Sequence, residues 1–207
     1  NLYMQNYSDD KRLADSVSSI AGNKLTNTSN YVSAFRVTGN PESLFEVAYL
    51  SNSENIGVNT SMQTSFTTLV TPGNQVQTGG FGDLVATISL LNDLGITLTG
   101  GNTTPVFALN HTIASRSNDV RNLLFEPGTA GRGPIKTECT KYLGKNGFIN
   151  LDNAIVMRIA EAYLIRAEAQ ATPGSSVLNL VNALADLKTI KANRYTGYAG
   201  SALEIAD

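Results

Sequence analysis

The chain has 207 residues, of which 42% are hydrophobic and 15% are charged, and its formal net charge is −2. This composition excludes a disordered chain, and the absence of a basic field excludes nucleic-acid binding driven by phosphate neutralisation. The single cysteine and single histidine exclude a disulfide within the chain and a structural zinc site built from Cys and His. The polar residues are mostly Asn, Thr, Ser and Gly.

The first third of the sequence predicts one helix, one strand and a long loop. Residues 8–20 form an apolar stripe at helical spacing, with Ser8 as the expected N-cap. Residues 43–50 alternate between apolar and polar side chains, as in a strand. Residues 51–80 are polar and rich in Asn, Ser and Thr. A loop of this length is usually functional or mobile.

The middle of the sequence gives weaker signals. Residues 83–94 predict a second helix because their apolar residues share one face. Residues 95–118 predict loop or short strand. The apolar run at 120–125 fits a helix or a strand equally well, and the glycine-rich residues 128–134 predict a flexible loop.

The last third predicts an αα-hairpin. Residues 153–171 and 175–191 both have helical periodicity, and Thr-Pro-Gly at 172–174 breaks the chain between them. The second helix is expected to bury one apolar face, made of Val177, Leu180, Val181, Leu184 and Leu187. Ser201 predicts the N-cap of a third helix that the sequence cuts short, so we expect the chain to be a fragment of a longer protein.

Motifs for catalysis are absent from the sequence. It has no nucleophile elbow, phosphate-binding P-loop or metalloprotease helix. Cys139 and His111 would form a nucleophile–base pair only if folding brought them together. We expect Cys139 to be a buried structural thiol in a strand, and His111 to lie in a polar loop.

Acidic residues on the predicted hairpin raise the possibility of a glycosidase, whose chemistry needs two carboxyl groups. Glu161 and Glu168 lie near Arg158 and Arg166 in sequence. We expect these four residues to form structural ion pairs. No catalytic residue, metal ligand or cofactor site is predicted.

Several segments, taken in order, resemble the SusD/RagB family of surface glycan-binding lipoproteins of Bacteroidetes. The most specific match is 153–169, where the family reads "N-x-P-V-x-R-x-A-E-x-x-L-I-x-A-E-A". The sequence departs from the family at Ala154 and Ile155, where Pro is frequent, and at Lys188, where Arg is common. The other matching segments are residues 2–7 with 14–17, Pro-Glu-Ser-Leu-Phe-Glu-Val at 41–47, Asp-Val-Arg with Leu-Phe at 119–125, and Thr-Lys-Tyr at 140–142.

The resemblance implies a mainly α, SusD-like fold: tetratricopeptide-like αα-hairpins with a loop-rich insert that contains a few short β-strands. We expect one SusD-like region over 1–207. In it, 1–22 ends the N-terminal helical repeats, 23–150 is the loop-rich part, and 151–207 holds the C-terminal hairpin and truncated third helix. The family's later helix, signal peptide and lipid-bearing Cys are absent from the sequence. The fragment is therefore expected to be soluble.

The resemblance also implies a non-enzymatic role. Such proteins bind oligosaccharide or polysaccharide at the bacterial cell surface and pass it to a SusC-like TonB-dependent transporter in the outer membrane. A membrane association would run only through an N-terminal lipid anchor. Neutral sugars are recognised by aromatic faces and by amide or hydroxyl groups, which the weakly charged loops of this chain supply.

No family motif fixes the sugar site, so we select polar loops that carry an aromatic residue. For each Phe the alternative is that it packs beneath its own loop. Two further hypotheses remain open: a helical scaffold that binds only protein and has no sugar site, and a glycosidase that uses Glu161. The predicted ligand-binding residues are Asn74, Gln75, Gln77 and Phe81 in one loop, and Asn102, Phe107, Asn110 and His111 in the other.

Overall fold

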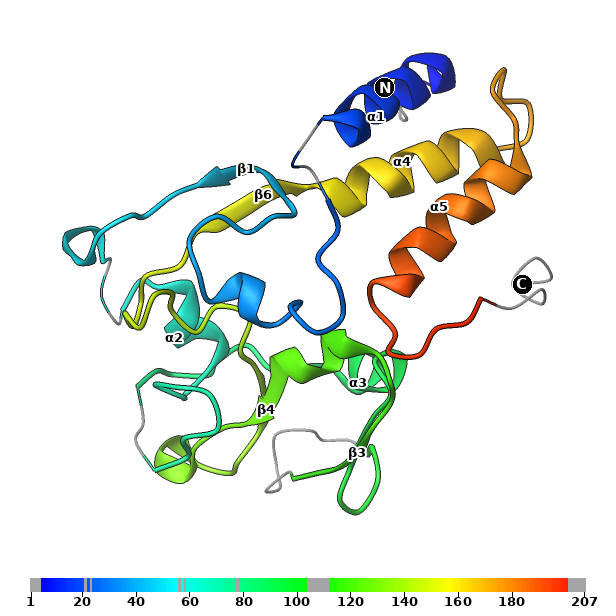
Figure 1. Ribbon diagram of the computed structural model, residues 1–207. Helices are drawn as coiled ribbons and strands as arrows, with labels where there is room; N and C mark the ends of the chain where they lie inside the picture. Colours follow the sequence, from blue (N-terminus) through cyan, green and yellow to red (C-terminus); the bar gives the residue numbers. More distant parts are fainter. Residues whose placement is uncertain are drawn as a thin grey trace. The chain divides into compact units, whose positions relative to one another are not determined.

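The structure is a computed structural model that describes residues 5–20, 22, 24–55, 57, 59–76, 79–103 and 112–200 (Figure 1). Its contacts divide the chain into two compact units, which are described separately. The helical unit comprises Asn1–Thr28, Gly39–Val47 and Ile155–Asp207. The loop-rich unit comprises Ser29–Thr38 and Ala48–Ala154.

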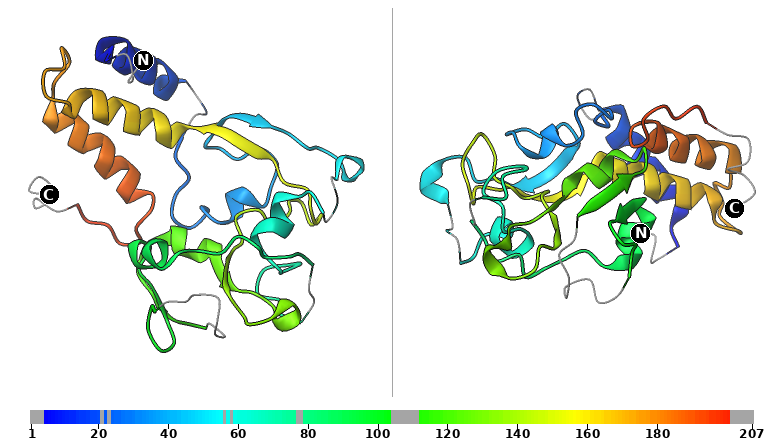
Figure 2. Two further views of the ribbon diagram at one scale, coloured as in Figure 1. Left: turned by 180° about the vertical axis from the view of Figure 1, so that it is seen from behind. Right: turned by 90° about the horizontal axis from the view of Figure 1, so that it is seen from below.

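The described residues of the helical unit form three helices and a two-stranded sheet. Helix α4 packs against both α1 and α5 (Figures 1 and 2). Strands β1 and β6 pair with each other, and β6 runs directly into α4. In chain order the elements are α1 (Tyr7–Ser19), β1 (Ser43–Val47), β6 (Ala154–Arg158), α4 (Ile159–Ala171) and α5 (Leu180–Ala192).

A small apolar cluster joins α1 to α4. Ala14 of α1 and Ile159 and Ala162 of α4 are buried at its centre. Alanine side chains are short, so the two helices can approach closely while still removing apolar surface from water. Partly buried side chains surround this centre: Val17, Leu25, Leu44 and Tyr163.

A buried ion pair fastens the chain segments beside this cluster. Glu42 is 2% exposed and Arg194 is 4% exposed. Arg194 Nη2 donates to Glu42 Oε1 at 2.7 Å and to Oε2 at 2.8 Å. Glu42 Oε1 also accepts the Thr26 N–H at 2.8 Å. Arg158 Nη1 lies 3.6 Å from Glu42 Oε2. The Glu42 carbonyl accepts the Ile159 N–H at 2.8 Å, at the junction of β6 and α4.

The loop-rich unit contains short elements only. Strands β2 and β3 pair antiparallel with an irregularity between Thr97 and Leu98, and β4 and β5 pair antiparallel with Glu126 opposite Glu138. Short 3₁₀ helices lie at Ser33–Phe35, Asn52–Glu54, Val120–Leu124 and Ala130–Arg132. The remaining elements are α2 (Met62–Phe66), α3 (Ile88–Asp93), β2 (Ile96–Leu98), β3 (Ile113–Arg116), β4 (Phe125–Pro127) and β5 (Thr137–Cys139).

A single apolar core lies beneath α3 and the β2–β3 hairpin. Leu91 is fully buried, and Ile96 and Leu98 are each 1% exposed. The hairpin therefore turns one face inward. The buried members of the core are Tyr31, Ala86, Leu91, Leu94, Ile96, Leu98, Val120, Leu124 and Phe125.

The structure confirms the first predicted helix and corrects its cap. Helix α1 begins at Tyr7, and Asn6 is the N-cap, since its Oδ1 accepts the Asp9 N–H at 3.4 Å. The expected cap, Ser8, lies inside the helix and donates its hydroxyl to Asn6 Oδ1. The predicted strand at 43–50 is confirmed as β1 but ends at Val47.

The predicted helix at 153–171 is wrong at its start. Residues 154–158 form strand β6, and the helix begins at Ile159. Pairing with β1, closed by the Ile159 N–H on the Glu42 carbonyl, holds these residues extended. As a result Val156, which helical periodicity over 153–171 would have placed in a helix, lies in a strand and is 56% exposed.

The second helix of the hairpin is confirmed as α5, but its start and buried face are wrong. It begins at Leu180 and not at 175, because the Asn179 side chain caps it by accepting the Asn182 N–H at 3.1 Å. Its buried residues are Ala183 and Asp186. Much of the expected apolar face is exposed: Leu180 by 62%, Val181 by 77% and Leu187 by 40%.

The middle of the chain shows shorter elements than predicted. The expected helix at 83–94 is α3 over Ile88–Asp93 only, because Thr87 caps it by accepting the Leu90 N–H at 3.2 Å. The ambiguous run at 120–125 is a 3₁₀ helix that enters β4. The expected third helix from Ser201 lies outside the described residues.

We predict that Glu42→Gln destabilises the protein by about 3–5 kcal/mol, because it leaves the Arg194 guanidinium buried without its counter-charge. Urea unfolding followed by circular dichroism measures this loss. The matched control is Lys11→Gln, which removes a partly exposed ion pair with Asp15 and is expected to cost less than about 1 kcal/mol. Equal unfolding midpoints for the two variants would contradict the prediction.

Candidate functional site

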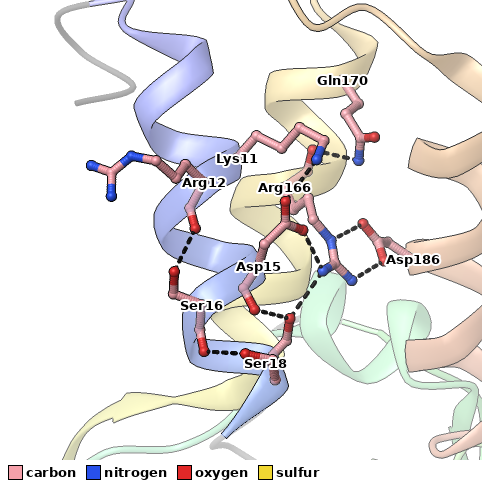
Figure 3. A network of polar contacts seen from close by, with 9 residues as sticks. Lys11, Arg12, Asp15, Ser16, Ser18, Arg166, Gln170 and Asp186 are labelled. Atoms are coloured by element: carbon pink, nitrogen blue, oxygen red, sulfur yellow. Dashed lines mark hydrogen bonds and ion pairs between the residues drawn. The ribbon is translucent and has the colours of Figure 1, made fainter.

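An arginine on α4 holds α1 and α5 (Figure 3). Arg166 Nη1 lies 2.9 Å from Asp15 Oδ1 on α1 and donates to Ser18 Oγ at the same distance. Its Nε and Nη2 donate to the two carboxylate oxygens of Asp186 on α5, at 2.8 and 2.6 Å. This bidentate geometry explains why α5 buries Asp186 while Leu180 and Leu187 are exposed.

A polar recess of about 260 Å³ opens beside this network. The hydrogen bonds that Arg166 donates to Asp186 are the main cause that raises the pKa of Arg166 above its ordinary range. Burial raises the pKa of Asp15, but hydrogen bonds from Lys11 and Arg166 outweigh it and lower that pKa. The charged groups around the recess are thus paired with one another. The recess is best explained as part of the ion-pair network that holds the helices together. Its lining residues are Lys11, Asp15, Arg166, Gln170, Asn182, Ala185 and Asp186.

The predicted ion pairs of Glu161 and Glu168 with Arg158 and Arg166 are wrong, because both arginines pair with other carboxylates. Arg158 pairs with Glu42, and Arg166 pairs with Asp15 and Asp186. The cause is that β6 places Arg158, and the middle of α4 places Arg166, beside other segments of the chain. Glu161 and Glu168 themselves are exposed.

A second cavity, of about 150 Å³, lies within the loop-rich unit; we call it the Asp152 cavity. It is lined by Tyr49, Ser61, Met62, Asn150, Asp152 and Ala154. Ser61 is 2% exposed, and Asn150 and Asp152 are each 8% exposed. Three buried polar side chains therefore share this cavity with one aromatic residue and two apolar ones.

Local backbone geometry positions Ser61 and Asn150 in the cavity. Ser61 is the N-cap of α2, where its Oγ accepts the Thr64 N–H at 3.2 Å. The same hydroxyl donates to Asn150 Oδ1 at 2.7 Å. Asn150 has a φ of 57°, a left-handed conformation that Asn adopts more readily than most residues, and its N–H donates to Gln63 Oε1 at 2.7 Å.

Asp152 is only partly satisfied. Its Oδ1 accepts the Gly144 N–H at 3.0 Å, whereas Oδ2 is buried and has no hydrogen-bond partner among the described residues. Burial raises the pKa of Asp152 to about 6, against the lowering effects of the Gly144 N–H and of the charges of Arg36 and Lys145. The carboxyl group therefore changes its charge close to neutral pH.

Arg36 is unsatisfied in the same way. All three nitrogens of its guanidinium group are buried and have no hydrogen-bond partner among the described residues. Burial lowers the pKa of Arg36, while the charges of Glu126, Asp152 and Cys139 raise it. A guanidinium left without partners in the interior is costly.

The first predicted loop is anchored by a buried carboxylate, Glu138 on β5. Glu138 is 1% exposed, and its Oε2 accepts the Thr68 N–H at 2.6 Å and the Thr67 hydroxyl at 2.9 Å. Gly82 and Gly128 approach this carboxylate so closely that a Cβ on either would collide with it. The segments at 67–68, 82 and 128 therefore converge on one side chain.

The residues predicted in that loop lie on its outer part. Asn74 Oδ1 accepts the Val76 N–H at 3.1 Å, within the loop itself. Gln75 is exposed and its Nε2 donates to the Gly128 carbonyl at 2.9 Å. Phe81 is half-buried. Gln77 lies outside the described residues.

The second predicted loop has one described candidate, Asn102. Its Oδ1 accepts the Leu98 N–H at 2.9 Å, and its Nδ2 donates to the Ile96 carbonyl at 2.7 Å and to Asn92 Oδ1 at 2.6 Å. The Asn102 side chain thus links the end of β2 to α3 through hydrogen bonds. The other predicted residues of this loop, Phe107, Asn110 and His111, lie outside the described residues.

The described candidate residues are held by two separate sets of hydrogen bonds. Gln75 is tied to the end of β4 and Asn102 to β2 and α3, and neither belongs to the Asp152 cavity. Sequence reasoning missed that cavity because its residues come from three distant segments. The only signal in the sequence for this cavity was the group of Asn and Asp residues at 150–153.

Other site types find little support in the described part of the chain. No three His, Cys, Asp or Glu residues there are grouped so that they could hold a metal ion. None of the helices described is long and apolar enough to cross a membrane. Cys139 is in a strand, β5, as predicted, but it is half-buried and not fully buried. Burial nevertheless raises the pKa of its thiol, which disfavours the nucleophilic thiolate.

Three solved structures share the fold of this chain. A SusD superfamily protein from Bacteroides thetaiotaomicron VPI-5482 matches with a TM-score of 0.65 and 22% identity, over 95% of this chain and 39% of its own. A SusD-like protein from Bacteroides fragilis NCTC 9343 matches with a TM-score of 0.62 and 16% identity, over 99% of this chain and 47% of its own. A SusD superfamily protein from Bacteroides vulgatus ATCC 8482 matches with a TM-score of 0.52 and 22% identity, over 93% and 38%.

The chain therefore has a SusD-like fold, which confirms the resemblance found in the sequence. It spans less than half the length of each of these three structures. No protein-family model matches the sequence, and no curated protein matches it either.

We predict that Asp152→Asn makes the protein less sensitive to pH. The folded-state pKa of about 6 lies above the unfolded value near 4, so the stability from this group is fully present below pH 4. It is lost as the pH rises through about 6. The wild-type protein should therefore lose on the order of 2 kcal/mol more than Asp152→Asn between pH 4 and pH 7. Urea midpoints across this range measure the difference, and parallel profiles would refute it.

Proposed function

We propose that this chain is part of a SusD-like protein that binds oligosaccharide or polysaccharide at the cell surface without catalysis. The observation that carries the proposal is the SusD-like fold, shared over nearly the whole chain with three solved structures. The low charge of the sequence fits a ligand that is itself neutral.

The chemistry of the loop-rich unit supports the same proposal. Many of its polar side chains are amides and hydroxyls, which pair with sugar hydroxyls in both directions. Asn74, Gln75 and Phe81, together with Gln77, Asn102, Phe107, Asn110 and His111, remain the proposed ligand-binding residues. Asn102 is the weakest of these because its amide is occupied within the fold.

The proposal extends to the partner and the location. The whole protein would deliver bound glycan to a SusC-like TonB-dependent transporter, and it would be held in the outer membrane by an N-terminal lipid anchor. The helical hairpin α4–α5 would be one of its tetratricopeptide-like repeats, and residues 1–207 would form one SusD-like region with the three parts given by the sequence.

A second candidate function rests on one specific observation. Helix α5 and the residue before its cap expose four large apolar side chains: Leu178, Leu180, Val181 and Leu187. Exposed apolar surface of this kind marks protein–protein contacts, as a helical scaffold without a sugar site would use. Capture of an outer-membrane β-barrel that persists in the Phe81→Ala and Phe107→Ala variants, with no glycan binding, would favour this function.

We predict that Phe81→Ala weakens glycan binding about tenfold, because a stacked aromatic ring contributes roughly 1.4 kcal/mol. Calorimetric titration with a panel of host and dietary polysaccharides measures the effect. Phe45→Ala is the matched control, since Phe45 lies on β1 and is 58% exposed, outside the predicted loops.

The outcomes separate the alternatives. A lower melting temperature with unchanged affinity in Phe81→Ala would show that this ring only packs beneath its loop. Absence of binding across the whole panel by the wild-type protein would overturn the proposed function. Turnover of an aryl glycoside that is abolished by Glu161→Gln would replace it with a glycosidase.

A further inference from the structure

We propose that Glu126 is a positioning residue of the first predicted loop. Its carboxylate fixes the loop tip, residues 71–76, so that Asn74 and Gln75 offer a hydrogen-bond donor and an acceptor to a sugar. The inference rests on the proposed glycan-binding function and deepens it, because it names the groups of this loop that meet the ligand hydroxyls. Glu126 itself lies on β4, outside the residues selected from the sequence.

The loop tip begins with a β-turn. Residues 71–74 read Thr-Pro-Gly-Asn, and Pro at the second position with Gly at the third is the signature of a type II turn. The Asn74 N–H donates to the Thr71 carbonyl at 3.2 Å, and Gly73 has a φ of 70°. The turn bond does not use the Gly73 N–H, so this group can donate to an acceptor outside the turn. Glu126 Oε2 accepts it at 2.6 Å.

The tip depends on Glu126, whereas the base of the loop does not. The base, at 67–68, is buried and bonded to Glu138. The tip is mostly exposed, Val76 by 96%. The Glu126 bond and the Gln75 amide, which donates to the carbonyls of residues 127 and 128, hold it on β4 and the residue after it. Loss of the Glu126 bond should therefore loosen the tip and leave the base in place.

The pairing of β4 with β5 explains why a carboxylate faces the tip. Glu126 lies directly opposite Glu138 in this antiparallel pair, and residues directly opposite each other project from the same face. Since Glu138 binds the base of the loop, Glu126 lies on the face that the loop covers. Like charges opposite each other are destabilising, and the Gly73 N–H is one donor that offsets this cost for Glu126.

The anchored tip leaves one donor and one acceptor for a ligand. Asn74 uses its Oδ1 to accept the Val76 N–H, and Gln75 uses its Nε2 to bind the Gly128 carbonyl. Asn74 Nδ2 and Gln75 Oε1 make no hydrogen bond among the described residues. Sugar hydroxyls both donate and accept, so neighbouring hydroxyls can pair with both groups. Fixing the two amides before binding lowers the entropy that binding costs.

The competing explanation for Glu126 is electrostatic. The positive charges of Arg36 and Arg116 act on Glu126, so the carboxylate would serve only as their counter-charge and would not matter to the loop. The two explanations differ in what they require of the side chain: positioning needs an oxygen that accepts the Gly73 N–H, whereas the electrostatic role needs the negative charge.

The test compares Glu126→Ala with Glu126→Gln in the full chain. Both variants lose the charge, but only Gln keeps an oxygen that can accept the Gly73 N–H. The probes are neutral oligosaccharides of glucose, galactose, mannose and xylose, titrated by calorimetry. We expect Glu126→Ala to weaken binding at least tenfold and Glu126→Gln to stay within threefold of the wild type. The matched control, Asp93→Ala, removes an exposed carboxylate on α3 and should bind as the wild type does.

Amide hydrogen exchange adds a readout that needs no ligand. In Glu126→Ala the Gly73 amide should exchange at least tenfold faster than in the wild type. The Thr68 amide, which is bonded to Glu138, should keep its wild-type rate and so show that the variant is folded. An unchanged Gly73 rate would overturn the inference.

The affinities separate this inference from the proposed function. If the wild type binds an oligosaccharide and both Glu126 variants bind it as well as the wild type does, the tip does not need Glu126. If both variants are equally weak, the charge matters and the hydrogen bond does not. Either result overturns the inference and leaves the proposed function standing. If the wild type binds no saccharide, both are overturned.

Discussion

Each unit of this chain is organised around a buried glutamate whose carboxylate must be satisfied by segments distant in sequence. A buried carboxylate is tolerated only when donors or a counter-charge surround it. In the helical unit, Glu42 gathers the Thr26 backbone, Arg158 and Arg194. In the loop-rich unit, Glu138 gathers Thr67 and Thr68, with Gly82 and Gly128 pressed against it. These two carboxylates therefore help to determine which distant segments meet in each unit.

The same constraint explains features that the apolar pattern does not. Helix α5 exposes Leu180 and Leu187 because Asp186 must reach Arg166 on α4, and a bidentate pair tolerates little rotation of the helix (Figure 3). Strand β6 replaces the first turn of the expected helix because its end is tied to the Glu42 carbonyl. In α5 and β6 a hydrogen bond, to a charged side chain or to the backbone, fixes the orientation or conformation of the segment. Apolar side chains become exposed as a consequence.

The sequence predicted what depends on local chemistry. Helices α1, α4 and α5, strand β1 and the SusD-like fold were all foreseen, since periodicity, caps and a family-like motif over 153–169 are local signals. It failed where long-range contacts decide: the start of α4, the buried face of α5 and the partners of Arg158 and Arg166. The Asp152 cavity could not be predicted for the same reason, because Tyr49, Ser61 and Asn150 meet only after folding.

The buried carboxylates differ in how far the fold itself satisfies them. Glu42 and Glu138 are each surrounded by donors from the chain itself, so their role is complete within the fold. Asp152 is buried to a similar extent, yet one of its oxygens meets no donor among the described residues, and Arg36 nearby is equally unsatisfied. The charges of Arg36 and Asp152 act on each other, so each partly offsets the cost of burying the other.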